Sequence, residues 1–177
     1  MKPSVTDLLK LLDKPALLNW ANKIGLEGIN INDYRKKSMA GGSSIHYQIE
    51  MYIKHKRPFD SQETMDRFNS FFDGKTIIEI EKPIETEYFK GRMDVSILVD
   101  GKKYICDFKS NQKGVYLENK LQLTAYRMAE NCDIVGIISV PDFTFIPVNI
   151  TDFEPYEKIL KSLSEIYKYK KIIDNGN

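Results

Sequence analysis

The fold of this chain is decided by Gly91-Arg-Met-Asp-Val-Ser-Ile-Leu-Val-Asp-Gly-Lys-Lys-Tyr-Ile-Cys-Asp-Phe-Lys109. Two apolar, β-prone runs flank Asp100-Gly101, and this combination predicts a β-hairpin. Asp94 then lies on the first strand, and Asp107 lies on its partner. Because residues two apart on a strand share a face, Asp107 and Lys109 point to the same side of the sheet.

Two carboxylates and a lysine at one sheet surface suit the chemistry of a divalent cation beside a phosphate. Carboxylate oxygens bind Mg²⁺ or Mn²⁺, and the ammonium group of Lys109 orients a water molecule or a phosphate oxygen. The alternative is a solvated ion pair on a hairpin, since Asp-x-Lys and Gly-x-x-Asp are each common patterns. The rest of the chain decides between these two interpretations.

The composition is typical of one folded globular domain. The chain has 177 residues, of which 42% are hydrophobic and 29% are charged. Its formal net charge is +1, so a nucleic-acid-binding surface has to be a local basic patch. Two cysteines, Cys106 and Cys132, lack the spacing of metal ligands and predict no disulfide framework. Without a signal peptide or a long apolar run, we expect no membrane association and a cytoplasmic location.

Helix signals dominate the first part of the chain. Ser4-x-x-Asp7 has the spacing of a helix N-cap, and Pro15 suits the first turn of a second helix. Residues 27–44, which include the flexible pair Gly41-Gly42, are predicted as loop or weak helix. The next helix carries His46, which on its own is either a structural histidine or a metal ligand.

The hydrophobic period then changes, and strands alternate with helices. The remaining elements are expected as a helix at 61–72, strands at 76–81 and 85–99 with Pro83 interrupting, the second hairpin strand, a helix at 117–130, strands at 134–140 and 143–150, and a helix at 152–169. This order predicts an α/β (α+β) fold in which helices pack on the faces of a central sheet.

Four short motifs follow one another along the chain: Gly42-x-x-x-His46-x-x-x-Glu50, Gly91-x-x-Asp94, Asp107-x-Lys109 and Gln122-x-x-x-Tyr126. In this order they resemble the RecB-type branch of the PD-(D/E)XK nuclease superfamily. The opening Pro3-Ser-Val-Thr-Asp-Leu-Leu, with Trp20 downstream, resembles phage-type exonucleases similar to mitochondrial genome maintenance exonuclease. The Lys-rich last helix is similar too, so the resemblance covers nearly the whole chain.

The resemblance implies a restriction-endonuclease-like core, a central mixed β-sheet flanked by helices, in a single nuclease domain over residues 1–177. Residues 1–75 would be a helical region able to form an arch over the site. Residues 76–177 would be the catalytic core that contains the sheet. Trp20, in the helical region, is either a core anchor or a base-stacking residue.

The resemblance also implies a role for each motif residue. The metal ligands would be His46, Asp94, Asp107 and the backbone carbonyl of Phe108. Lys109 would position the attacking water and stabilise charge on the phosphate. Gln122 would hold the lysine or the substrate backbone, and Tyr126 would support that helix. Glu85 lies upstream of Gly91, where relatives often carry a glutamate. It is expected at most to contact the metal ligands, and not the metal itself.

The implied cofactor is Mg²⁺ or Mn²⁺, and a histidine ligand favours Mn²⁺ alongside Mg²⁺. Some relatives hold an iron–sulfur cluster with four cysteines, and with two cysteines this chain is expected to hold none. Basic residues bracket His46 in sequence, and they form either the entrance for a DNA strand or solvated helix ends. They are Arg35, Lys36, Lys37, Lys54, Lys56 and Arg57.

We therefore expect a Mg²⁺/Mn²⁺-dependent deoxyribonuclease, an exonuclease on single-stranded DNA or flaps with a free end. Phage-type replication or recombination, with proteins of those processes as partners, is the expected setting, in the cytoplasm of a bacterial host if the chain is phage-encoded. One alternative is a structure-selective endonuclease such as a junction resolvase. Another is a non-catalytic DNA-binding subunit on the same fold, against which the intact set of His46, Asp94, Asp107 and Lys109 argues.

Overall fold

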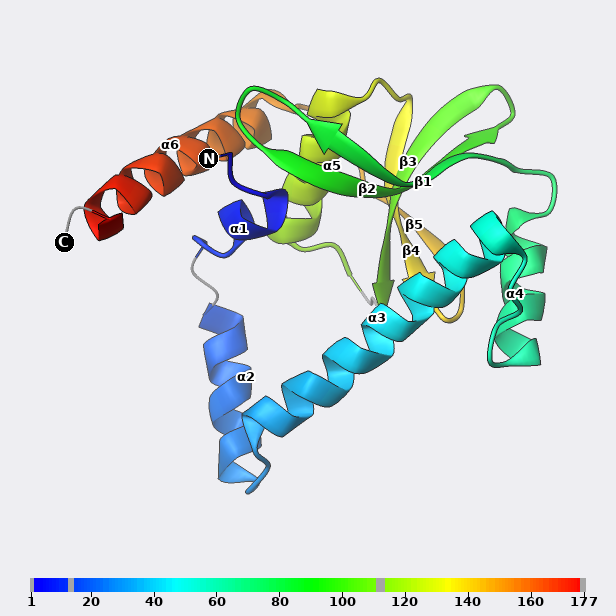
Figure 1. Ribbon diagram of the computed structural model, residues 1–177, viewed down its shortest axis with the longest axis horizontal. Coiled ribbons are helices and arrows are strands. Elements are labelled where there is room, and N and C mark those ends of the chain that lie inside the picture. Colours follow the sequence, from blue (N-terminus) through cyan, green and yellow to red (C-terminus); the bar gives the residue numbers. More distant parts are fainter. Residues whose placement is uncertain (1, 13–14, 111–113, 176–177) are drawn as a thin grey trace.

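The computed structural model describes residues 2–12, 15–110 and 114–175, except for the side chains of residues 15–17, 20, 24, 31, 34–44 and 175. It has an α+β fold in which helices flank one five-stranded mixed sheet (Figure 1). The helices are α1 (Val5–Leu9), α2 (Pro15–Leu26), α3 (Ile31–His55), α4 (Gln62–Phe72), α5 (Leu117–Ala129) and α6 (Glu154–Asn175). The strands are β1 (Thr76–Glu85), β2 (Lys90–Val99), β3 (Lys102–Ser110), β4 (Ile134–Val140) and β5 (Thr144–Pro147). The expected sheet with helices on its faces is confirmed.

The sheet has the strand order β1-β2-β3-β4-β5. Its first three strands, which include the predicted hairpin, form an antiparallel meander, and β3 pairs with β4 in parallel. A parallel pair needs a crossover connection, which α5 supplies. At the predicted hairpin turn, Asp100 and Gly101 have φ angles of 49° and 76°. Two successive residues with positive φ are typical of a type I′ turn, so the hairpin is confirmed.

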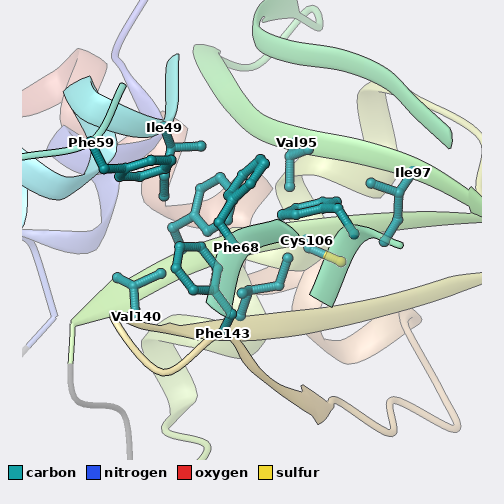
Figure 2. Packing of buried hydrophobic residues seen from close by; sticks show 11 residues of the cluster. Ile49, Phe59, Phe68, Val95, Ile97, Cys106, Val140 and Phe143 are labelled. Carbon is teal, nitrogen blue, oxygen red and sulfur yellow. The ribbon is translucent and has the colours of Figure 1, made fainter. Parts of the chain in front are cut away.

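Two apolar clusters cover opposite faces of the sheet. On one face α3 and α4 pack against β2 and β3, and Figure 2 shows the rings and aliphatic side chains that fill this layer. The cluster includes Ile49, Phe59, Phe68, Phe72, Val95, Cys106 and Phe108. The cluster on the other face, under α5, includes Ile105, Leu123, Tyr126 and Ile137. Because Cys106 and Phe108 face α3, Asp107 between them faces α5.

The long helix α3 differs from the prediction of loop or weak helix over residues 27–44. It begins at Ile31, where the side chain of Asn30 accepts from the backbone N–H of Asn32 and of Asp33. Gly41-Gly42 lie inside the helix, although each glycine disfavours a helix interior by up to about 1 kcal/mol. Helix formation is cooperative, so the cap at one end and packing of fully buried Ile49 near the other outweigh that penalty.

Pro83 does not interrupt the first strand, which is a second difference from the prediction. β1 runs unbroken from Thr76 to Glu85, and Pro83 pairs with Arg92 of β2. β1 is the edge of the sheet, where a residue without an N–H group is tolerated. The strand therefore continues past residue 81, and the turn into β2 is closed by Thr86 N–H donating to the Phe89 carbonyl at 2.9 Å.

Smaller differences concern the C-terminal elements. β5 covers only Thr144–Pro147 of the strand expected at 143–150, and α6 continues to Asn175, beyond the expected end at residue 169. In Figure 1 the C-terminal end of α6 extends away from the sheet. Among the helices of the described residues, none has both the length and the apolar character needed to cross a membrane.

Gly136 of β4 is fixed by a close approach of β5. A Cβ atom at this position would lie 2.2 Å from a ring carbon of Phe145 and 3.0 Å from the carbonyl oxygen of Ile146. We expect Gly136→Ala to destabilise the fold by about 1–3 kcal/mol, since the ring and the strand have to shift. Thermal unfolding should show a fall of several degrees. The control is Gly25→Ala in α2, where a new Cβ meets nothing within 4 Å; equal melting temperatures for both variants would contradict the packing at Gly136.

Candidate metal centre

The candidate site lies where β2 and β3 diverge. Their ladder ends at the pair Val95–Cys106, whereas β2 stays paired with β1 as far as Lys90. Just beyond the last pair, the backbone N–H of Phe108 donates to the Oδ2 atom of Asp94 at 2.9 Å. The carboxylate thus accepts a hydrogen bond that a strand carbonyl would otherwise take. Asp94 is held in the opening between the strands and is 9% exposed.

Asp107 is 1% exposed, and side chains from α5 surround its carboxylate. The Nε2 atom of Gln122 donates to Oδ1 at 2.7 Å, and the hydroxyl of Tyr126 donates to the same oxygen at 3.2 Å. The ammonium group of Lys109 lies 2.5 Å from Oδ2 and donates to Oε1 of Gln122 at 3.1 Å. Gln122 and Tyr126 are four residues apart on α5, so one helix face presents both. The structure brings these four predicted residues together.

The hydroxyl of Tyr126 links the two carboxylates. It donates to Asp107, accepts from Gln122 at 2.7 Å and lies 3.5 Å from the Oδ1 atom of Asp94. Burial, together with the charges of Asp94 and Asp107, raises the pKa of Tyr126 well above its usual value. The hydroxyl therefore keeps its proton at neutral pH and remains a donor to the carboxylates.

His46 reaches the same place from α3. Its Nδ1 atom lies 4.0 Å from the Oδ2 atom of Asp94, and its ring meets the Phe108 ring edge-on, with centroids 5.7 Å apart. Burial lowers the pKa of His46, and the opposing effect of the Asp107 charge is smaller. A hydrogen bond to the Phe108 backbone also favours the protonated ring. Phe108 is the residue whose carbonyl the family resemblance implies as a metal ligand. The neutral imidazole is the form that binds metals.

Glu81 is a residue of this site that belongs to none of the sequence motifs. Its neighbours Ile80 and Lys82 pair with Val95 and Met93 of β2, so Glu81 lies across from Asp94. Its φ angle of 52° lies in the left-handed region. A non-glycine residue held there carries about 1–3 kcal/mol of strain, and such strain concentrates at functional sites. One ligand atom each from His46, Glu81 and Asp94 lies within 4.8 Å of the other two. The three residues therefore form a candidate metal-binding triad.

Glu85, the glutamate expected behind the ligands, lies elsewhere. It is at the end of β1, it is exposed, and its carboxylate pairs with the ammonium group of Lys2. Glu85 lies four residues after Glu81, a step of roughly 13 Å along a strand. Glu81 is therefore the β1 glutamate that reaches the centre, and Glu85 is not brought to it.

The centre holds more negative charge than its protein partners neutralise. Burial raises the pKa of Asp94 well above its usual value, with smaller contributions in the same direction from the charges of Asp107 and Glu81. Burial also raises the pKa of Glu81, against the charge of Arg92. Oε2 of Glu81 and Oδ2 of Asp107 are buried without a hydrogen bond of regular geometry. Such oxygens beside a neutral imidazole fit a hard divalent cation.

Of the basic residues predicted to guide DNA, the structure describes the side chains of three. Lys54 donates to Glu50 at 2.7 Å, Lys56 lies over an aromatic ring at 5.8 Å, and Arg57 is exposed. Because His46, Glu50 and Lys54 are spaced by four residues, Lys54 lies on the face of α3 that carries His46. The side chains that lie outside the described residues are those of Arg35, Lys36, Lys37 and Trp20.

Replacing His46 by alanine is expected to weaken Mn²⁺ binding by roughly tenfold or more, because a nitrogen ligand is lost. Raising the Mn²⁺ concentration should then restore part of the activity. Calorimetric titration of Mn²⁺ into wild type, His46→Ala and His55→Ala measures this, with exposed His55 at the end of α3 as the matched control. If His46→Ala binds Mn²⁺ as tightly as wild type, His46 is a structural residue.

No known family model matches this chain, and no curated protein is detectably similar to it. One matching solved structure, described as the crystal structure of SSO0001, is 17% identical and covers 93% of this chain and 76% of its own, with a TM-score of 0.47. At this level of similarity, neither fold nor function passes from that structure to this chain.

Proposed function

We propose that this protein is a metal-dependent deoxyribonuclease built on a PD-(D/E)XK core, and that it acts as an exonuclease on single-stranded DNA or flaps. The observation that carries the proposal is the convergence of Asp94, Asp107 and Lys109 from one hairpin with His46 from α3. The predicted motif residues of α5 hold this set through hydrogen bonds to Asp107 and Lys109. Such a closed network favours a catalytic site over the solvated ion pair that the hairpin alone allows.

Bound by His46, Asp94, Asp107 and the carbonyl of Phe108, a divalent cation would neutralise phosphate charge and lower the pKa of a bound water. The protein's own contribution is to orient the groups around it. Gln122 Oε1 accepts from the Lys109 ammonium. The Lys109 side chain is 30% exposed, so its ammonium group can also donate to a phosphate oxygen or a water. An ammonium fixed in this way stabilises charge that develops in the transition state.

Tyr126 and Gln122 keep Asp107 in one orientation. Both donate to its Oδ1 atom, which leaves Oδ2 turned toward Lys109 and free of a regular hydrogen bond. Supporting residues commonly orient a metal ligand in this way: they bind one oxygen of the carboxylate and leave the other available to the metal. The same two donors explain how Asp107 is tolerated at 1% exposure before a cation neutralises it.

The substrate class follows from the groups that the site offers. Carboxylates, an imidazole and a lysine act on the phosphodiester, which carries no base information, so the proposed cleavage is not sequence-specific. α2 and the first half of α3, here called the helical arm, extend away from the sheet (Figure 1). The second half of α3 carries His46 to the site. This geometry supports a strand with a free end that passes along the arm to the centre.

Digestion of end-labelled single-stranded, duplex and flap DNA with Mg²⁺ or Mn²⁺ tests the proposal. We expect degradation of the single strand and of the flap, from an end, and none with a chelator. A circular single strand should stay intact. Cleavage of the circle would instead assign a structure-selective endonuclease, and binding of DNA without cleavage under any metal would assign a non-catalytic DNA-binding protein.

A further inference from the structure

Arg92 and Glu81 form an unequal ion pair at the metal centre. The Nε atom of Arg92 lies 2.5 Å from the Oε2 atom of Glu81. The Glu81 side chain is 6% exposed, whereas that of Arg92 is 65% exposed. In spite of the contact, Oε2 has no hydrogen bond of regular geometry. A buried carboxylate is thus neutralised by a cation that approaches from solvent.

We propose that Glu81 is a further protein ligand of the metal centre and that Arg92 is the cation that a divalent ion displaces from it. This inference rests on the proposed function, because it concerns the same centre. A Glu81 oxygen lies within 4.8 Å of ligand atoms of both His46 and Asp94. Ligand atoms of one Mg²⁺ are at most about 4.2 Å apart, so small side-chain rotations bring all three into contact with a single ion.

The backbone supports a ligand role for Glu81. The register of β1 against β2 shifts between Ile77 and Glu79, and Glu81 has a φ angle of 52°. The pairs Ile80–Val95 and Lys82–Met93 flank Glu81 and Asp94, so the two residues lie across from each other, and both are buried. Like charges directly opposite one another destabilise a sheet. A buried pair of this kind is therefore explained by a cation that lies between the two carboxylates.

The ion pair of Arg92 with Glu81 is weak enough for a divalent ion to displace Arg92. Arg92 contacts Glu81 through Nε, and most of its side chain lies in solvent, where pairing is weak. An ion bound by Glu81, His46 and Asp94 would repel the guanidinium and claim the same carboxylate. Metal binding and the Arg92–Glu81 contact therefore compete for one carboxylate. Once released, the guanidinium group of Arg92 lies beside the site and can donate two parallel hydrogen bonds to a phosphate.

Mn²⁺ titrations by calorimetry at fixed pH and ionic strength test this competition in four proteins: wild type, Glu81→Gln, Arg92→Gln and the double variant. Glu81→Gln should weaken Mn²⁺ binding by roughly tenfold or more. Arg92→Gln should tighten it by about three- to tenfold, because a competing charge is removed. In the Glu81→Gln background, Arg92→Gln should change the affinity by less than about twofold, since the two effects act through one carboxylate.

Two controls match the charges that are removed. Glu79→Gln alters a glutamate on the same strand that pairs with Lys82, and Arg67→Gln alters an arginine on α4 that pairs with Glu63. Both should leave Mn²⁺ affinity within about twofold of wild type. Because Arg92 is at the surface, its variant tests the competition even if Glu81→Gln fails to fold.

The outcomes separate this inference from the proposed function. If wild type binds no Mn²⁺, the metal centre itself is wrong and the proposed function fails with it. If wild type binds Mn²⁺ but Glu81→Gln binds it equally well, only the ligand role of Glu81 is overturned. Weaker Mn²⁺ binding by Arg92→Gln would show that Arg92 helps the centre to bind the metal, and it would contradict the proposal that the metal displaces Arg92 from Glu81.

Discussion

Asp107→Asn is expected to abolish DNA cleavage and to leave the metal-free protein folded. Asparagine keeps the oxygen that accepts from Gln122 and Tyr126, so the hydrogen bonds around Oδ1 remain possible. It removes the negative charge that a divalent cation needs. The rate should fall by more than about a thousandfold, beyond the usual loss for a single hydrogen-bond donor.

The stability of the metal-free variant tests the reason given for this effect. Asp94 and Asp107 are buried close together, and the Asp107 charge contributes to the raised pKa of Asp94. Removing the Asp107 charge relieves this repulsion but also removes the ion pair with Lys109, so the melting temperature of the metal-free protein should stay close to that of wild type. Asp100→Asn in the exposed hairpin turn is the matched control and should cleave like wild type. A clear loss of melting temperature in metal-free Asp107→Asn would show that this carboxylate is structural.

Lys109→Ala is expected to reduce turnover by roughly two to three orders of magnitude and to leave metal binding intact. Lys109 is no metal ligand; its ammonium group contacts Asp107 and Gln122 from the open side of the site. Metal affinity should hold or rise, because a positive charge next to the centre is deleted. Affinity for DNA should fall only modestly, since many phosphates along the strand share that contact.

Single-turnover cleavage beside a metal titration separates these effects for wild type, Lys109→Ala and Lys109→Arg. Arginine should not rescue the rate fully, because its planar fork cannot reproduce a compact ammonium group. Lys103→Ala is a suitable control on the same strand, since Lys103 pairs with Glu130 outside the candidate site. Equal single-turnover rates for wild type and Lys109→Ala would show that Lys109 has no catalytic role and only forms a solvated ion pair with Asp107.

The parts of the site that depend on short-range patterns were predictable from the sequence. The type I′ turn at Asp100-Gly101 sets the hairpin register and therefore the relation of Asp94 to Asp107. Likewise, a four-residue spacing on a helix brings Gln122 and Tyr126 to one face. Local chemistry determines these relations, and no distant contact is needed to fix them.

Glu81 was not predictable for a physical reason. Its position opposite Asp94 depends on a register shift between Ile77 and Glu79 and on a positive φ angle at Glu81 itself. Non-glycine residues rarely adopt that conformation, so no sequence pattern indicates it. If β1 is assumed to be unbroken, counting residues back from Asp94 through the β1–β2 turn indicates that Glu81 lies near it. The predicted break at Pro83 prevented this count.

The first half of α3 shows the same limit on a larger scale. Gly41-Gly42 and the neighbouring serines favour a turn locally, which is why residues 27–44 are predicted as loop or weak helix. The helix forms because its two ends are stabilised, by the Asn30 cap and by the buried contacts of Ile49. Tertiary packing outweighs intrinsic propensity here, as it commonly does in folded proteins.

The central claim is that this centre hydrolyses DNA with the aid of a divalent cation. The most direct test is to measure cleavage of a labelled single-stranded oligonucleotide by the wild-type protein and by Asp107→Asn, each with Mn²⁺ and with a chelator. We predict cleavage by the wild type with Mn²⁺ only, and none by the variant. Cleavage that persists in the variant or in the chelator, or a wild type that binds Mn²⁺ and leaves every strand intact, would contradict the claim.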